Sequence, residues 1–140
     1  MRFTWVALAC AVFTGLLLLA VCGDGLRRAA VSGIILIDKE PLPEGAIDFF
    51  PIDGPQVGGV VKNGQYSIPE AKGVIVGSNR VEIRGFRKSG RKVEDVWEKG
   101  KMIEERVFAV PPEYNVKSTL VRAVQAGNNT FDFDLPGIKP

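Results

Sequence analysis

The chain has 140 residues and is nearly balanced in charge, with 18 Lys and Arg against 16 Asp and Glu. This balance gives no reason to expect a nucleic-acid partner. The sequence contains no His, which removes the commonest general base and the commonest metal ligand, so neither a metal nor another cofactor is predicted. The length supports one domain, and both cysteines, Cys10 and Cys22, precede it, so no internal disulfide is expected.

The N-terminal segment has the layout of an export signal. Met1 and Arg2 give a positive start, and residues 3–21 form an uncharged, mostly apolar run that ends in small residues. The sequence Leu-Ala-Val-Cys at its end resembles the lipobox of bacterial lipoproteins, with Val21 at a position where that family prefers Gly or Ala. The resemblance implies that residues 1–22 are a signal peptide, that Cys22 is lipidated, and that the protein is anchored to a membrane of the cell envelope.

Two other interpretations of this segment remain open. The apolar run is also long enough to span a bilayer as an uncleaved anchor, and ordinary signal cleavage would release a secreted protein. All three interpretations place the domain outside the cytoplasm, after a short tether at residues 23–29.

The chain then opens with two apolar stretches joined by a polar turn, which predicts a β-hairpin over residues 31–51. The first strand is expected at residues 30–37 and the second at 46–52. Alternation of side chains along a strand places one set of apolar residues in the core: Val31, Ile35, Ile37, Ile47 and Phe49.

Further short strands follow, separated by turn signals. Asn63-Gly64 predicts a tight type I′ turn between strands at 60–62 and 65–68, because both positions tolerate positive φ. Clean alternation predicts strands at 80–84 and at 130–135. A strand at 118–124 would place Arg122 on the apolar face with Leu120 and Val124, so this strand is expected near an edge.

Residues 85–107 interrupt this rhythm with a dense run of charges and are expected to form a long loop, of the kind that is usually functional or mobile. No helix is predicted after the signal segment. About seven short strands with turn signals between them predict an all-β, antiparallel Greek-key β-sandwich over residues 30–136.

Six segments occur in an order that resembles the carboxypeptidase regulatory-like, or transthyretin-like, β-sandwich domain, and in particular the small predicted lipoproteins of this type in planctomycete bacteria. They read V-S-G-I-I-L-I-D-K-E-P-L, G-A-I-D-F-F-P, N-G-Q-Y-S-I-P, V-E-I-R-G, P-P-E-Y-N-V-K-S-T-L and N-N-T-F-D-F-D-L. The resemblance implies the fold and no particular chemistry. Glu40 stands where the family usually has Gly, which predicts an open first turn, and the missing His excludes the hydroxyisourate hydrolase branch.

The charged loop holds the candidate contact residues. Its basic residues could meet an anionic surface polymer or lipid headgroups, although acidic residues follow at once and would neutralise them. The basic candidates are Arg87, Lys88, Arg91 and Lys92. Trp97 lies among these charges and is expected either to contact a sugar ring or partner protein or to fold back onto the sandwich as a lid.

Catalytic residues are not predicted. Ser89 lies near Lys88 and Lys92, but a polar loop would solvate it. Asp132 and Asp134 share one strand face and could in principle bind Ca²⁺, yet a solvated face is the preferred interpretation, as it is for Asp48 and Asp53.

Two further segments are assigned structural roles. Tyr114 is expected to hydrogen-bond to backbone at a corner made by Pro111 and Pro112. Asn128-Asn129-Thr130 is interpreted as turn chemistry rather than as a glycosylation site.

The sequence therefore predicts a non-enzymatic, envelope-anchored β-sandwich with a binding or structural role, which contacts a surface protein or polysaccharide through residues 85–107. Two alternatives are an accessory subunit of an exported enzyme or transporter and a hydrolase that uses carboxylates only. The hydrolase requires a concave pocket lined by at least two buried acids.

Overall fold

The computed structural model describes residues 25–139. The predicted signal segment, with Cys10 and Cys22, lies outside the described residues. Within residues 25–139, no helix has the length and apolar character needed to cross a membrane.

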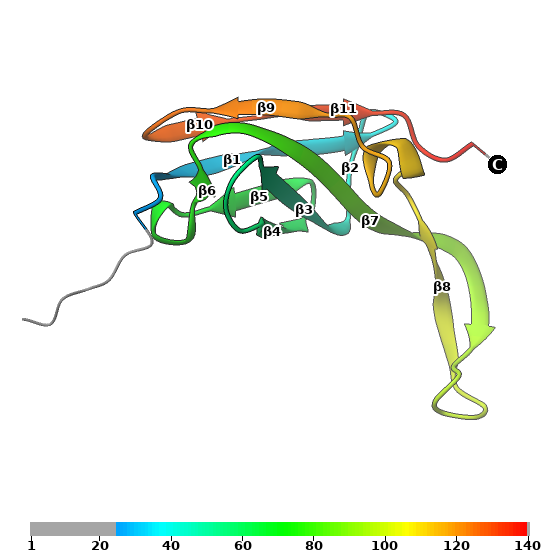
Figure 1. Cartoon of the computed structure of the whole chain (residues 1–140). Coiled ribbons are helices and arrows are strands. Elements are labelled where there is room, and N and C mark those ends of the chain that lie inside the picture. Colours follow the sequence, from blue (N-terminus) through cyan, green and yellow to red (C-terminus); the bar gives the residue numbers. More distant parts are fainter. Residues whose placement is uncertain (1–24, 140) are drawn as a thin grey trace, which may run out of the picture.

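The regular structure of residues 25–139 is β-strand apart from two short 3-10 helices, and most strands pair antiparallel, which confirms the all-β prediction (Figure 1). The elements are β1 (Arg28–Ile37), β2 (Glu40–Pro41), β3 (Glu44–Pro51), β4 (Val57–Lys62), β5 (Gln65–Ile68), the 3-10 helix η1 (Glu70–Lys72), β6 (Val74–Ile75), β7 (Gly77–Glu94), β8 (Met102–Phe108), the 3-10 helix η2 (Pro112–Tyr114), β9 (Val121–Val124), β10 (Asn128–Thr130) and β11 (Phe133–Leu135). Neighbouring strands follow the order β10-β1-β5-β4-β3-β7-β8. The Greek-key connectivity stays a prediction.

The predicted hairpin over residues 31–51 is wrong, because its two strands, β1 and β3, do not pair with each other. β1 turns tightly through Asp38 and Lys39, whose φ angles are 52° and 70°, and pairs with the two-residue strand β2. The prediction of an open turn at Glu40 is therefore also wrong. Pro41 and Pro43 cannot extend this ladder, and β5 and β4 separate β1 from β3 in the sheet.

The predicted core is confirmed in full. Ile35 and Val31 of β1 are buried, as are Ile47 and Phe49 of β3. In the antiparallel β3–β7 ladder, Ile47 lies opposite Ile83 and Phe49 lies opposite Val81, so these apolar pairs form a continuous layer.

Two local predictions also hold. Asn63 and Gly64 have φ angles of 48° and 75° and join Lys62 of β4 to Gln65 of β5, as a type I′ turn requires. Arg122 lies on β9, which pairs with β7 alone among residues 25–139. Its guanidinium carbon lies 4.7 Å from the centre of the Phe133 ring. The edge position lets this cation share a face with apolar residues.

The strand expected at residues 130–135 is divided into β10 and β11, and both pair with β1 in parallel rather than antiparallel. The break falls at Phe131 and Asp132. Here the Phe131 carbonyl crosses directly over Gly33, where a Cβ would lie only 1.9 Å from the oxygen. The Asp132 carboxylate accepts a hydrogen bond from the Ile34 N–H at 2.9 Å in place of a regular ladder bond.

The prediction of a long loop at residues 85–107 is also wrong. β7 continues to Glu94 and returns as β8, so that these residues form a two-stranded antiparallel hairpin. We call residues 86–108 the arm. Figure 1 shows it at the lower right, where the end of β7 and the whole of β8 project away from the body of the protein. Cross-strand pairing of the charged side chains lets a highly charged segment form strands, which the alternation of apolar residues alone did not indicate.

Candidate functional site

The arm leaves the core at Gly85. This glycine packs against Leu42, and a Cβ at Gly85 would lie 2.5 Å from a Leu42 methyl carbon. From residue 86 to residue 108 no side chain is buried. The arm is therefore held by its own ladder and its side-chain pairs rather than by the core, and it presents both faces to solvent.

The basic candidates lie on β7, and two of them, Lys88 and Arg91, form ion pairs with acidic residues of β8. Lys88 Nζ lies 2.8 Å from Glu104 Oε2, and Arg91 donates to both carboxylate oxygens of Glu105, at 2.7 and 2.9 Å. These hydrogen bonds raise the pKa of Lys88 and of Arg91. Because Lys88 and Arg91 are each bound to a carboxylate, the arm is locally neutralised.

Glu105 is the most heavily bonded carboxylate of the arm. Besides Arg91, it accepts a hydrogen bond of 2.6 Å from Ser89 Oγ. The hydrogen bonds from Arg91 and then Ser89 lower the pKa of Glu105. Ser89 thus donates to a carboxylate, and its neighbour Lys88 is held by Glu104, an arrangement that does not activate the Ser89 hydroxyl as a nucleophile.

Arg87 and Lys92 remain available. Both side chains are exposed, and neither forms an ion pair among residues 25–139. These two cations are the members of the predicted basic set that can bind a partner without first breaking an internal pair.

Trp97 lies at the tip of the arm and is 91% exposed, next to Val96, which is 87% exposed. It does not fold back as a lid. Residues 95–101 form a turn fixed by several hydrogen bonds: the Asp95 carboxylate accepts from the Trp97 N–H at 2.8 Å, and the Glu94 carboxylate accepts from the Gly100 N–H at 2.7 Å. The turn is closed by the Asp95 N–H, which donates to the Lys101 carbonyl at 2.7 Å.

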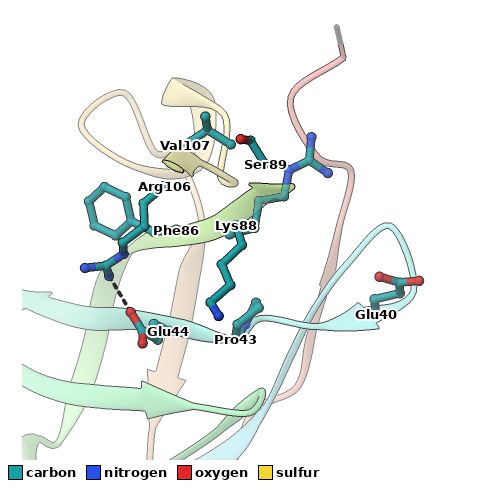
Figure 2. A pocket seen from close by; sticks show the side chains of 9 residues that line it. Glu40, Pro43, Glu44, Phe86, Lys88, Ser89, Arg106 and Val107 are labelled. Atoms are coloured by element: carbon teal, nitrogen blue, oxygen red, sulfur yellow. Dashed lines mark hydrogen bonds and ion pairs between the residues drawn. The ribbon is translucent and has the colours of Figure 1, made fainter. Parts of the chain in front are cut away.

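Two hollows flank the root of the arm. One, of about 720 Å³, is lined by Glu40, Pro43, Glu44, Phe86, Arg87, Lys88, Ser89, Arg106 and Val107. Figure 2 shows Arg106 reaching across this hollow to Glu44, with Phe86 beside it. The Arg106 guanidinium carbon lies 5.1 Å from the centre of the Phe86 ring.

The second hollow, of about 870 Å³, lies over β3, β4 and the root of the arm, where Phe86, Arg106 and Phe108 line it. Its apolar wall includes the ring pair Phe86 and Phe108, with centroids 4.9 Å apart, and the exposed side chain of Val60. The acidic residues of the two hollows are Glu40 and Glu44, and both are exposed. Neither hollow has the pair of buried acids that the carboxylate-only hydrolase requires.

The other acidic candidates serve the fold. Asp132 accepts from backbone, and Asp134 pairs with Lys39. Asp48 is only 6% exposed, so its assignment to a solvated face is wrong: it pairs with Arg84 and accepts from Gln56 Nε2 at 2.9 Å. Among residues 25–139 no three acidic residues gather where they could hold a metal ion.

The corner at Pro111 and Pro112 is present as η2, and Tyr114 packs partly against the core. The tyrosine that hydrogen-bonds to backbone is Tyr66, whose hydroxyl donates to the Phe131 carbonyl at 2.7 Å. The side-chain amide of Asn129 stabilises the turn before β10 by donating a hydrogen bond to the Gln125 carbonyl at 2.8 Å.

Comparisons with models of protein families, with curated proteins and with solved structures find no match for this chain.

Proposed function

We propose that this protein is a non-enzymatic binding module of the cell envelope, anchored by a lipid on Cys22, and that it contacts a surface protein or polysaccharide with the tip of the arm. Its relationship to carboxypeptidase regulatory-like domains is part of this proposal. The support is the order of the six sequence segments together with an all-β body whose apolar layer those segments supply.

The observation that carries the binding role is the exposure of Trp97 on an ordered turn. An exposed Trp offers a large, flat apolar surface at little cost in conformational entropy, and such residues dominate many interfaces. The hydrogen bonds of Asp95 and Glu94 hold the turn before any ligand arrives. Preorganisation of this kind lowers the entropic cost of binding.

The unpaired charges of the arm add selectivity rather than most of the affinity. Arg87 and Lys92 are exposed cations without an internal ion pair, so they favour acidic groups on the partner. Rim charges of this type mainly steer association and make it depend on salt. A uronic-acid polymer and an acidic protein surface both present such groups.

The test is binding of the purified full-length protein to envelope fragments of the source cells. Trp97→Ala should weaken binding about 30-fold, the loss expected for a hot-spot aromatic residue. Ile52→Ala is the matched control, because Ile52 is another exposed apolar residue, at 83%, and lies on the body. Equal binding by wild type and Trp97→Ala would overturn the proposal.

Treatment of the fragments separates the two partner classes. Loss of binding after glycan hydrolysis identifies a polysaccharide, and loss after protease treatment identifies a protein, such as an exported enzyme or transporter that this chain accompanies. Mass spectrometry of the mature N-terminus tests the anchor separately: a diacylglyceryl group on Cys22 is expected, and an intact Met1 would contradict it.

A further inference from the structure

The outer edge of the arm is an unpaired strand. β8 has β7 as its one neighbour within the described residues. A two-stranded ribbon is only marginally stable in water by itself, and a free edge is a template for a further strand. The edge also carries apolar side chains at both ends, with Met102 57% and Phe108 62% exposed.

The backbone bonds of the arm show which groups of β8 are free. The Lys101 carbonyl accepts from Asp95, and the Ala109 N–H donates to Gly85 at 2.9 Å, so both of these odd-numbered residues face β7. Because backbone polar groups alternate in direction along an antiparallel strand, the even-numbered residues face outward. These residues are Met102, Glu104, Arg106 and Phe108.

A second copy of the same strand can pair antiparallel with β8 about a two-fold axis that passes through a residue, because only then do outward-facing residues meet each other. Three such axes, through Glu104, Glu105 or Arg106, pair at least five of the seven β8 residues with the second copy. An axis at Glu104 places Glu104 opposite Glu104 of the second copy, and an axis at Arg106 places Arg106 opposite Arg106. Both axes also place apolar side chains of β8 opposite charged ones. Like charges placed directly opposite are destabilising.

The register with its axis at Glu105 is complementary. It places Met102 opposite Phe108 of the second copy and Ile103 opposite Val107 of the second copy. It also places Glu104 opposite Arg106 of the second copy, and each of these pairs occurs twice by symmetry. Glu105 faces its own counterpart, but each Glu105 carboxylate is already held by Arg91.

We propose that the β8 edge is a self-recognition surface, and that two copies of this protein form an isologous dimer by antiparallel pairing of Met102–Phe108 about Glu105. The pairing converts two two-stranded arms into one four-stranded ribbon and satisfies the outward backbone groups of both copies. Charges on an edge strand often prevent such pairing, but here the sequence places opposite charges across from each other. This inference does not depend on Trp97 or on the anchor.

The test uses analytical ultracentrifugation of the full-length protein in detergent micelles. Arg106→Glu places Glu opposite Glu104 twice and should weaken dimerisation about tenfold. The double variant Glu104→Arg, Arg106→Glu restores opposite charges between the copies and should regain the dimer, although it leaves the internal pairs of Glu104 and Arg106 broken. Arg87→Glu changes the net charge by the same amount on β7 and should leave dimerisation unchanged.

Amide hydrogen exchange locates the interface. Protection of the Met102, Glu104, Arg106 and Phe108 amides should rise with protein concentration, while the Ile103 amide, which faces β7, should already be protected in the monomer. A wild-type protein that stays monomeric at its solubility limit overturns the proposal. So does a dimer whose even-numbered β8 amides stay unprotected, or a double variant that dimerises no better than Arg106→Glu.

Discussion

The hydroxyl of Tyr66 shows how one buried polar atom can fix an irregular part of this fold. It donates to the Phe131 carbonyl at 2.7 Å, at the point where β10 and β11 are interrupted. The side chain is buried, and this burial is the main cause that raises the pKa of Tyr66, with a further contribution from the negative charge of Asp132. The bond therefore joins β5 to a carbonyl that cannot take part in a regular ladder.

Tyr66→Phe should lower the free energy of unfolding by about 1–2 kcal/mol at neutral pH, because it leaves the Phe131 carbonyl without this donor. Urea unfolding measures the change. Tyr114→Phe is the control, since Tyr114 is only partly buried and its hydroxyl has no hydrogen-bond partner among residues 25–139. An equal loss in both variants would show that the Tyr66 bond has no special role.

The comparison of wild type with Tyr66→Phe also predicts how the stability difference between them depends on pH. Folding raises the pKa of Tyr66 above its usual value of about 10, so the folded state holds this proton more tightly than the unfolded state. The resulting stabilisation is complete below about pH 10 and declines as the pH rises toward the raised pKa. The stability difference between wild type and Tyr66→Phe should shrink over that range, and a constant difference would contradict the assignment.

At the scale of elements, the close approach of the Phe131 carbonyl to Gly33 explains why the last strand is divided. A regular strand at residues 130–135 would run unbroken beside β1, yet the chain instead bends over the one β1 residue that has no side chain. A Cβ at Gly33 would lie 1.9 Å from the Phe131 oxygen and 2.7 Å from its carbonyl carbon. The glycine is thus required for steric reasons rather than for an unusual φ.

Gly33→Ala should destabilise the protein by about 1–3 kcal/mol, the range for inserting a methyl group where there is no space. Thermal unfolding followed by circular dichroism measures the loss. The neighbouring substitution Ser32→Ala removes only the hydroxyl of a half-buried side chain on the same strand and should change stability by only a few tenths of a kcal/mol. A Gly33→Ala protein as stable as wild type would show that the Phe131 carbonyl moves away freely.

The whole molecule divides into a body with a core and an arm without one. Every buried apolar side chain of the described residues belongs to the body, and the arm is held by its ladder, its ion pairs and the contact between the rings of Phe86 and Phe108. Exposed ion pairs contribute little to global stability. The arm is therefore expected to contribute little to the stability of the body.

Replacing residues 88–106 with Asn-Gly should leave the melting temperature of the body unchanged within error, because no buried side chain is removed. Arg87 and Val107 form a pair that a two-residue type I′ turn can close. Scanning calorimetry should show one cooperative transition for the shortened protein. A large drop in melting temperature would mean that the arm packs on the body. In the binding assay, the shortened protein is expected to lose its binding to envelope fragments.

Sequence alone determined the all-β class, the residues of the core and the Asn63-Gly64 turn. Each of these follows from local alternation or from the φ preference of one dipeptide. Only the tertiary structure decided that β1 and β3 are not neighbours, that β10 and β11 run parallel to β1, and that residues 85–107 form an arm. These features depend on which distant segments pair and on charges that meet across two strands, and the local pattern of a single strand does not contain that information.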